Sequence, residues 1–163
     1  ALAAIFCGGL TPIATRASLL QGMHYTNSSA TAATFTLNNA TNLTFSGVFA
    51  DNRAVSPTST SQLNLVKQGV ADLTLTGPSS YVGTTSVDAG KLIVGPGGSL
   101  GTGAVAIITD LDYTRTDTFT LANQFSGTGT LSFLGANGVA KLTGKAPSAA
   151  DVKAALAGRE GAR

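Results

Sequence analysis

The chain has 163 residues, about the length of one ordinary domain, which is too short for a large multidomain enzyme. Charged residues make up 11% of it, well below the usual fraction of about a quarter, while glycine contributes 20 residues, so helices are disfavoured. The hydrophobic fraction of 43% is ordinary, so a core can be buried and a disordered chain is not expected. The composition therefore predicts an all-β protein, either globular or solenoidal.

The charges are few and scattered. There are 10 basic and 8 acidic residues, giving a net charge of +2, and no basic cluster is denser than Lys141 with Lys145. Nucleic-acid binding needs clustered Lys and Arg, so we expect no nucleic-acid partner. Cys7 is the single cysteine, which excludes an intrachain disulfide and a zinc site built from thiolates. We expect neither a metal nor a cofactor.

Residues 1–23 form an apolar N-terminal segment. Ala1 to Leu10 is almost wholly apolar, and no formal charge appears before Arg16. Three interpretations stay open: a remnant of a signal peptide, a segment that docks on its own core, or a strand inserted into a neighbouring subunit. Gly8, Gly9 and Pro12 interrupt the segment, and a bilayer-spanning helix needs about 20 apolar residues, so we expect no membrane span.

Apolar residues then recur at every second position in short segments. The alternation is visible at Thr34–Leu37 and Asn42–Phe45, with threonine or another small polar residue at the outward places. Such alternation is typical of strands with one buried face. The same pattern predicts strands at Leu63/Leu65, Leu73/Leu75, Leu92/Val94, Ala104–Ile108, Phe119/Leu121 and Leu131/Phe133.

The segment from Leu73 to Val94 reads LTLTGPSSYVGTTSVDAGKLIV. It resembles the passenger-associated transport repeat, also called the autotransporter-associated β-strand repeat, although Pro78 and Val82 depart from the family pattern. Leu65–Gly69 and Gly97–Gly101 resemble the segments that flank such a repeat. The residues that occupy the places of the pattern are Leu73, Leu75, Gly77, Tyr81, Gly83, Thr84, Thr85, Val87, Gly90, Leu92 and Val94.

The resemblance implies a right-handed parallel β-helix of the kind found in secreted bacterial passengers. In such a solenoid, each coil bonds to the coils above and below, and inward side chains stack into one apolar column. At roughly 20 to 25 residues per coil, residues 24–146 supply about five or six coils. Both ends of the solenoid then present edges that must be capped or paired with another chain.

Residues 147–163 change in character. Pro147 to Gly158 is rich in alanine, with Asp151 near its start and glycine as a stop, which predicts a short helix followed by a tail. The helix either caps the terminal coil or forms a linker toward a further domain.

Several residues invite a chemical interpretation. Gly97-Gly98-Ser99-Leu100-Gly101 matches the Gly-x-Ser-x-Gly elbow of hydrolases, but a strand, not a helix, is predicted to follow, and His24 is the sole candidate base. We therefore expect Ser99 to lie at a solenoid corner and His24 to be structural or at the surface. No catalytic residue is predicted.

The acidic residues give no stronger signal. Asp110, Asp112 and Asp117 lack the glycine and terminal glutamate of a calcium-binding hand, which predicts a solvated loop. Asp72 and Asp88 would suit acid–base cleavage of a polysaccharide if one face of the solenoid held both, but each is expected in a turn.

The leading functional prediction is a non-enzymatic extracellular β-solenoid, either a cell-surface passenger segment or a self-assembling fibre subunit. The fibre version predicts association through the solenoid ends or the N-terminal segment. An adhesin or glycan-binding module, using outward Thr, Asn and Tyr81, is the alternative, and a carbohydrate-active enzyme is a third. The resemblance implies a secreted or cell-surface bacterial protein.

Overall fold

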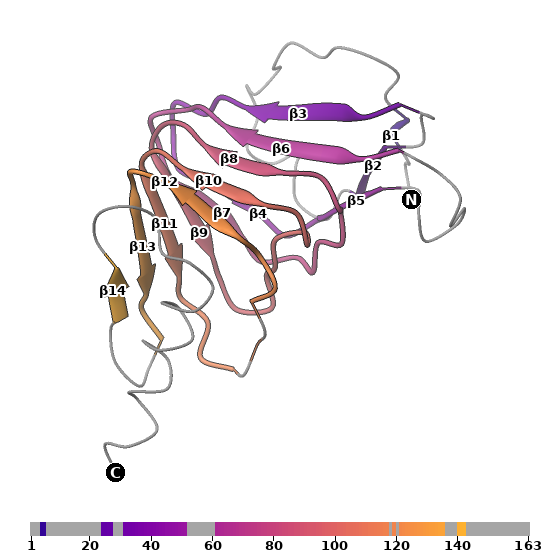
Figure 1. Ribbon diagram of the computed structural model, residues 1–163. Coiled ribbons are helices and arrows are strands. Elements are labelled where there is room, and N and C mark those ends of the chain that lie inside the picture. The colour runs from indigo at the N-terminus through magenta and orange to yellow at the C-terminus, as the bar shows by residue number, and fades with distance from the viewer. Residues whose placement is uncertain are drawn as a thin grey trace.

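The computed structural model describes residues 4–5, 24–27, 31–51, 61–117, 119, 121–135 and 140–142. All regular structure in these ranges is β-strand, and the strands stack into a β-solenoid of about five turns (Figure 1). The predicted all-β solenoid of about five or six coils is confirmed. The predicted helix within 147–163 and nearly all of the segment 1–23 lie outside the described residues.

Three sheets form the walls of the solenoid. Sheet A contains β1 (Ala4–Ile5), β2 (His24–Asn27) and β5 (Val48–Asp51). Sheet B contains, in spatial order, β3 (Ala33–Leu37), β6 (Leu63–Lys67), β8 (Thr85–Val87), β10 (Val105–Ile107) and β12 (Phe125–Gly127). Sheet C contains β4 (Leu43–Phe45), β7 (Leu73–Leu75), β9 (Lys91–Val94), β11 (Asp110–Tyr113), β13 (Thr130–Phe133) and β14 (Ala140–Leu142). Neighbouring strands are parallel except β13 and β14, which are antiparallel.

The coils differ in length. A hydrogen bond joins residues 20 apart where Thr84 meets Asn64, but 30 apart where Phe49 meets Ser79. The longer coil carries β5, which extends sheet A beside β2. In later coils the third wall is reduced to short contacts such as the parallel bridge of Pro78 with Ser99. The predicted coil length of about 20 to 25 residues therefore fits the later coils and not the first.

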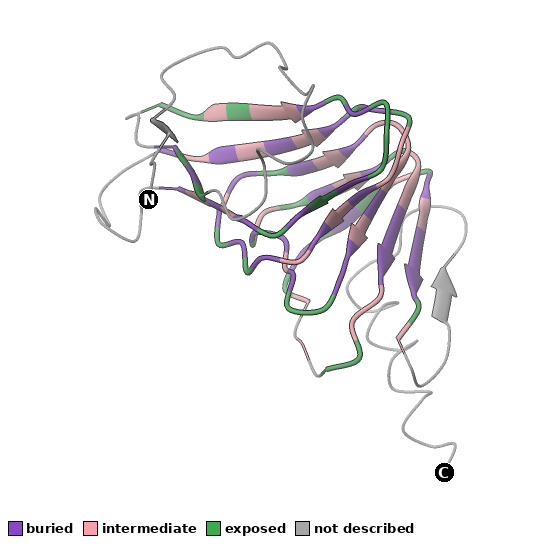
Figure 2. Ribbon diagram, turned by 180° about the vertical axis from the view of Figure 1, so that it is seen from behind, coloured by how far each residue is buried: buried purple, intermediate pink, exposed green. Residues whose placement is uncertain are grey.

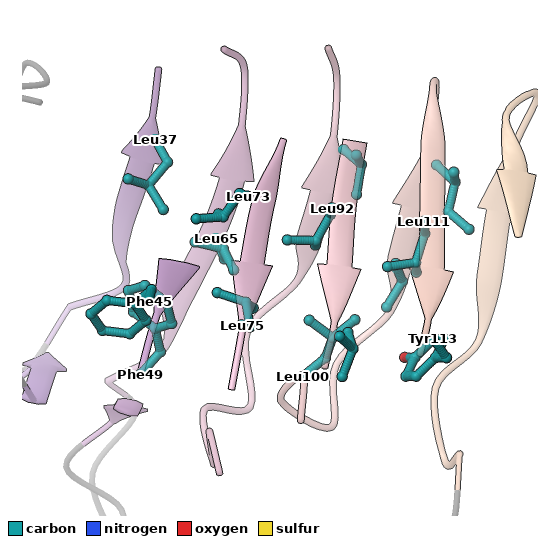
Figure 3. Close-up of a cluster of buried hydrophobic side chains, with 14 of the residues drawn as sticks. Leu37, Phe45, Phe49, Leu65, Leu73, Leu75, Leu92, Leu100, Leu111 and Tyr113 are labelled. Atoms are coloured by element: carbon teal, nitrogen blue, oxygen red, sulfur yellow. The ribbon is translucent and has the colours of Figure 1, made fainter. Parts of the chain in front are cut away.

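Inward side chains of sheets B and C stack in columns and form one apolar core. Buried residues alternate with half-buried or exposed ones along the strands, as Figure 2 shows across the sheets. The register of sheet C aligns Leu43, Leu73, Leu92, Leu111 and Leu131 in one column and Phe45, Leu75, Val94, Tyr113 and Phe133 in the next. Figure 3 shows leucines of successive coils following one another in this core. Because each column continues from coil to coil, every coil buries apolar surface against its neighbours.

Sheet B has two matching inward columns. They are Phe35, Leu65, Thr85, Val105 and Phe125, and Leu37, Lys67, Val87, Ile107 and Gly127. At the N-terminal end of the core, Phe45 and Phe49 pack with their ring centroids 4.5 Å apart, and Tyr25 lies 5.7 Å from each of these rings. The first coil is therefore filled by aromatic rings, whereas the middle coils are filled by leucine, valine and isoleucine.

Two glycines at the corners have no possible replacement. Gly90 has φ of 65°, and a Cβ there would lie 2.4 Å from the carbonyl oxygen of Gly69 in the preceding coil. A Cβ at Gly77 would lie 1.8 Å from the carbonyl oxygen of Gly47. Since both contacts are with backbone, the corners require residues that have no side chain.

Buried asparagine side chains fasten other corners. The amide of Asn39 donates to the carbonyl oxygen of Asp72 in the next coil at 2.9 Å. Asn123 donates to the carbonyl oxygens of Gly101 and Gly103 in the preceding coil at 2.7 and 2.8 Å. These bonds satisfy carbonyl groups that leave the strand ladders where the chain turns.

One strand prediction was wrong. Phe119 and Leu121 are not in a strand, and β12 begins at Phe125. Both are partly buried hydrophobic residues packed against the core, and the ring of Phe119 stacks on Tyr113 with centroids 5.3 Å apart. The apolar spacing therefore records packing at a turn between walls.

Candidate functional site

The repeat segment forms one full turn of the solenoid. Leu73 pairs with Leu92 and Leu75 pairs with Val94, so the segment starts in β7 and returns to the same wall one coil later in β9. Val87, in β8 between them, is fully buried in sheet B. The repeat therefore corresponds to one structural unit of the stack, in which each apolar place of the pattern points into the core.

Tyr81 lies inside the solenoid and has no exposed surface. Its hydroxyl group is 2.6 Å from the hydroxyl of Thr85, and burial raises the pKa of Tyr81 to about 12. A Cβ at Gly101 would touch the Tyr81 ring at 2.5 Å, so this glycine leaves the space that the ring fills. The expectation that Tyr81 points outward to a ligand was wrong, because its polar end finds a partner within the core.

The two threonines of the repeat point to opposite sides. Thr85 is buried with Tyr81, whereas Thr84 is exposed. The side-chain oxygen of Asn64 accepts hydrogen bonds from the Thr84 amide at 2.9 Å and from its hydroxyl at 3.2 Å. Gly83, just before them, has its Cα so close to Leu63 that a Cβ would lie 2.2 Å from the Leu63 carbonyl oxygen. This part of the repeat therefore joins adjacent coils.

Lys67, in the segment that flanks the repeat, is fully buried in an inward column of sheet B. Its ammonium group donates to the carbonyl oxygens of Gly69 and, at 3.0 Å, of Ala89 in the next coil. Burial lowers the pKa of Lys67, and the charge of Asp72 acts in the opposite direction. The sequence pattern marked this position only as a flank, because lysine at an alternating position normally predicts a solvent-facing side chain.

Ser99 does not form a hydrolase elbow. Its hydroxyl donates to the carbonyl oxygen of Ser79 at 2.9 Å, and β10 follows it, as predicted, in place of a helix. His24 is exposed in β2, and no hydrogen bond joins it to Ser99 in the described part of the chain. The geometry supports a structural corner and not a nucleophile with a base.

The acidic residues near 110 lie in a strand and not in the predicted solvated loop. Asp110 and Asp112 belong to β11, and Asp112 is buried and paired with Lys91 of the preceding coil at 2.8 Å. The hydrogen bond from Lys91 to Asp112 raises the pKa of Lys91. Asp117 is exposed and paired with Arg115, which lowers its pKa. Within the described ranges no group of three potential metal ligands exists.

Asp72 and Asp88 are in turns, as expected. Asp72 precedes β7, and its backbone amide donates to the side chain of Asn42 at 3.0 Å. Asp88 follows β8 and accepts a hydrogen bond from the hydroxyl of Ser86. No hydrogen bond or ion pair in the described residues joins the two carboxylates, so nothing brings them together as an acid–base pair.

These features define a β-solenoid in which the polar groups with chemical potential serve as bonds between coils. Residues 65–94 match the passenger-associated-transport-repeat family, which is consistent with an autotransporter passenger repeat and agrees with the resemblance read from the sequence. No curated protein and no solved structure matches the chain. Among the described residues, no helix has the length and apolar character needed to cross a membrane.

Proposed function

We propose that the chain is a non-enzymatic structural segment of a secreted or cell-surface bacterial passenger, and that it holds parts of the protein apart as a rigid spacer. One observation carries the proposal: the segment that matches the passenger repeat forms a complete coil whose polar side chains bond to neighbouring coils. In such stacks stability comes from contacts between neighbouring units. A solenoid of this kind therefore resists bending at every coil.

The candidate chemical groups support the same function. Ser99, Lys67 and Tyr81 each have a hydrogen-bond partner within the solenoid. Catalytic groups need a free face toward a substrate within hydrogen-bond reach. A role in holding coils together accounts for all three residues without a substrate.

Two measurements test the proposal. When the chain is pulled by its two ends in single-molecule force spectroscopy, a rigid spacer keeps its length until discrete unfolding events, whereas gradual extension at low force contradicts the spacer role. Antibodies raised against the purified chain should label intact bacteria that encode it. Labelling that requires permeabilised cells contradicts the location.

A second candidate function is self-assembly through the solenoid ends. In the described part of the chain, β3 and β12 form the two edges of sheet B, with Phe35 and Leu37 at one edge and Phe125 and Gly127 in the same columns at the other. Stacked copies would bring phenylalanine against phenylalanine and leucine against glycine. Antiparallel β14 covers the corresponding edge of sheet C, so any stack must accommodate it. Mass photometry and electron microscopy test this candidate: multimers or rods that grow with concentration support it, and a monomer at high concentration contradicts it.

A further inference from the structure

The outward face of sheet B carries no formal charge. Its side chains form two rows along the solenoid, one at each of two outward positions per coil. The rows are Thr34, Asn64, Thr84, Ala104 and Gln124, and Thr36, Val66, Ser86, Ala106 and Ser126. All ten side chains are half-buried or exposed, so the face is open to solvent (Figure 2). We call these ten residues the neutral face.

The other long wall differs. The outward face of sheet C holds Lys91 and Asp110 beside Asp112, which gives it fixed charges of both signs. The described residues with large exposed apolar side chains, Val70 and Ile108 at corners and Leu134, lie outside the neutral face as well. The neutral face therefore offers neither counter-charge for an acidic or basic partner nor an apolar patch for a lipid or a greasy protein surface.

Hydrogen-bonding groups repeat along this face at a fixed spacing. Strands in a sheet are about 4.8 Å apart, so the five strands of sheet B spread the rows over about 19 Å. Thr34, Thr36, Gln124 and Ser126 make no side-chain hydrogen bond within the described residues and present their polar groups to solvent. The small side chains between them keep the surface low and flat enough for an extended polymer to lie across it.

We propose that the neutral face binds an extended, uncharged polysaccharide whose hydroxyl groups exchange hydrogen bonds with the two rows. The partner is uncharged because the face is uncharged, and it is rich in hydroxyl groups because Thr, Ser, Asn and Gln both donate and accept. It is a polymer because each exposed hydrogen bond is worth little against water, so affinity requires many contacts along one chain. This binding is additional to the spacer function and does not depend on it.

The test measures adsorption of the purified chain to three neutral polymers, which are cellulose, an insoluble β-1,3-glucan and a mannan, and to acidic alginate. We expect saturable adsorption to at least one neutral polymer, unchanged by added salt, because no ion pair contributes. Oligosaccharides of two or three units should compete at least about 100-fold less well than the polymer. Wild-type protein should release no new reducing ends from the bound polymer.

Variants locate the binding surface. The triple variant Thr34→Lys, Ala106→Lys and Ser126→Lys places three charges on the neutral face, and we expect adsorption to fall at least tenfold. The matched control, Thr26→Lys, Thr44→Lys and Thr74→Lys, adds the same charges to outward positions of sheets A and C and should bind as the wild type does. Circular dichroism and the urea midpoint show whether both variants fold.

Four results would overturn the inference. They are no adsorption to any neutral polymer, preferential adsorption to alginate, equal loss in both folded triple variants, and equal binding by the folded neutral-face variant and the wild type. None of these results bears on the spacer function, which is tested by force and labelling. Cleavage of a polymer that disappears in Asp72→Asn or Asp88→Asn would instead contradict the non-enzymatic part of the proposed function.

Discussion

The ammonium group of Lys67 donates a hydrogen bond of 3.0 Å to the carbonyl oxygen of Ala89, one coil further along the solenoid. The lysine stands in a column that otherwise holds Leu37, Val87 and Ile107. A buried cation in an apolar column is tolerated only when its donors are used. Here those donors bind carbonyl groups that the corner removes from the strand ladder.

Replacement of Lys67 by methionine should lower the stability of the solenoid. Methionine fills the column but leaves the carbonyl oxygens of Gly69 and Ala89 without their donor, and hydrogen bonds from charged groups contribute about 1.5 to 3 kcal/mol. Removal of the cost of burying the charge offsets part of this loss. We expect a net decrease of about 1 to 2 kcal/mol in the free energy of unfolding, measured in urea. A variant as stable as the wild type contradicts the clamp.

The same pair of proteins has a defined pH dependence. Burial lowers the pKa of Lys67 in the folded state below its ordinary value of 10.5. Between these two pKa values the unfolded chain binds more protons than the folded chain, so the contribution of Lys67 to stability rises with pH. The stability of the wild type minus that of Lys67→Met should therefore grow as pH approaches 10.5 and stay constant above it. A difference that shrinks with pH contradicts the burial of an ammonium group.

Tyr81→Phe should destabilise the fold by about 1 kcal/mol, because the buried hydroxyl of Thr85 loses its partner. Thr85→Val removes the other half of the same bond. The double variant should then cost less than the sum of the single variants by about 1 kcal/mol. Additive effects in urea unfolding would show that the two hydroxyl groups are not coupled.

Tyr81 also predicts sensitivity to alkali. Its folded-state pKa is raised from 10.0 to about 12, so between these values the folded protein binds more protons than the unfolded chain and stability falls with rising pH. Tyr81→Phe should lose less stability than the wild type over this window. Equal losses in parallel urea titrations at pH 9, 10 and 11 would indicate that Tyr81 ionises normally.

Gly77→Ala should be far more damaging than Gly97→Ala. At Gly77 the new methyl group meets the backbone of Gly47 at 1.8 Å, which displaces one coil from the next, and we expect a loss of more than about 3 kcal/mol. Gly97 has φ of 75°, but its nearest neighbour is the carbonyl oxygen of Thr76 at 3.3 Å, so only the backbone strain of about 1 to 2 kcal/mol applies. Thermal unfolding distinguishes the two, and a similar loss at both sites would contradict the close approach of coils at Gly77.

The sequence predicted the strands well where apolar residues alternate. Leu73, Leu75, Leu92 and Val94 were placed correctly because the side chains in a strand alternate between two faces, whatever the strand pairs with. The wider arrangement of coils followed only from the resemblance to a known repeat. The extra length of the first coil, with β5, depends on contacts with β2, which no local pattern records.

The failures concern residues whose environment comes from another coil. Tyr81 was expected outside because it follows a polar turn, yet Gly101, 20 positions later, leaves the room that draws its ring inward. Asp110 and Asp112 read as a loop because acidic residues are rare in strands, but Lys91 in the preceding coil neutralises Asp112. Partners of this kind are set by the register of the stack.

The most direct test of the account measures the register of sheet B. Spin labels at Thr36 and Ser126, and at Val66 and Ser126, in a Cys7→Ser background, report outward positions of one row. The solenoid places the first pair four strands apart, about 19 Å, and the second pair about 4.8 Å closer, although the two first positions are 30 residues apart in sequence. Double electron–electron resonance should show this single step between the two distances. Distances that do not differ by about one strand spacing would contradict the parallel stack of coils.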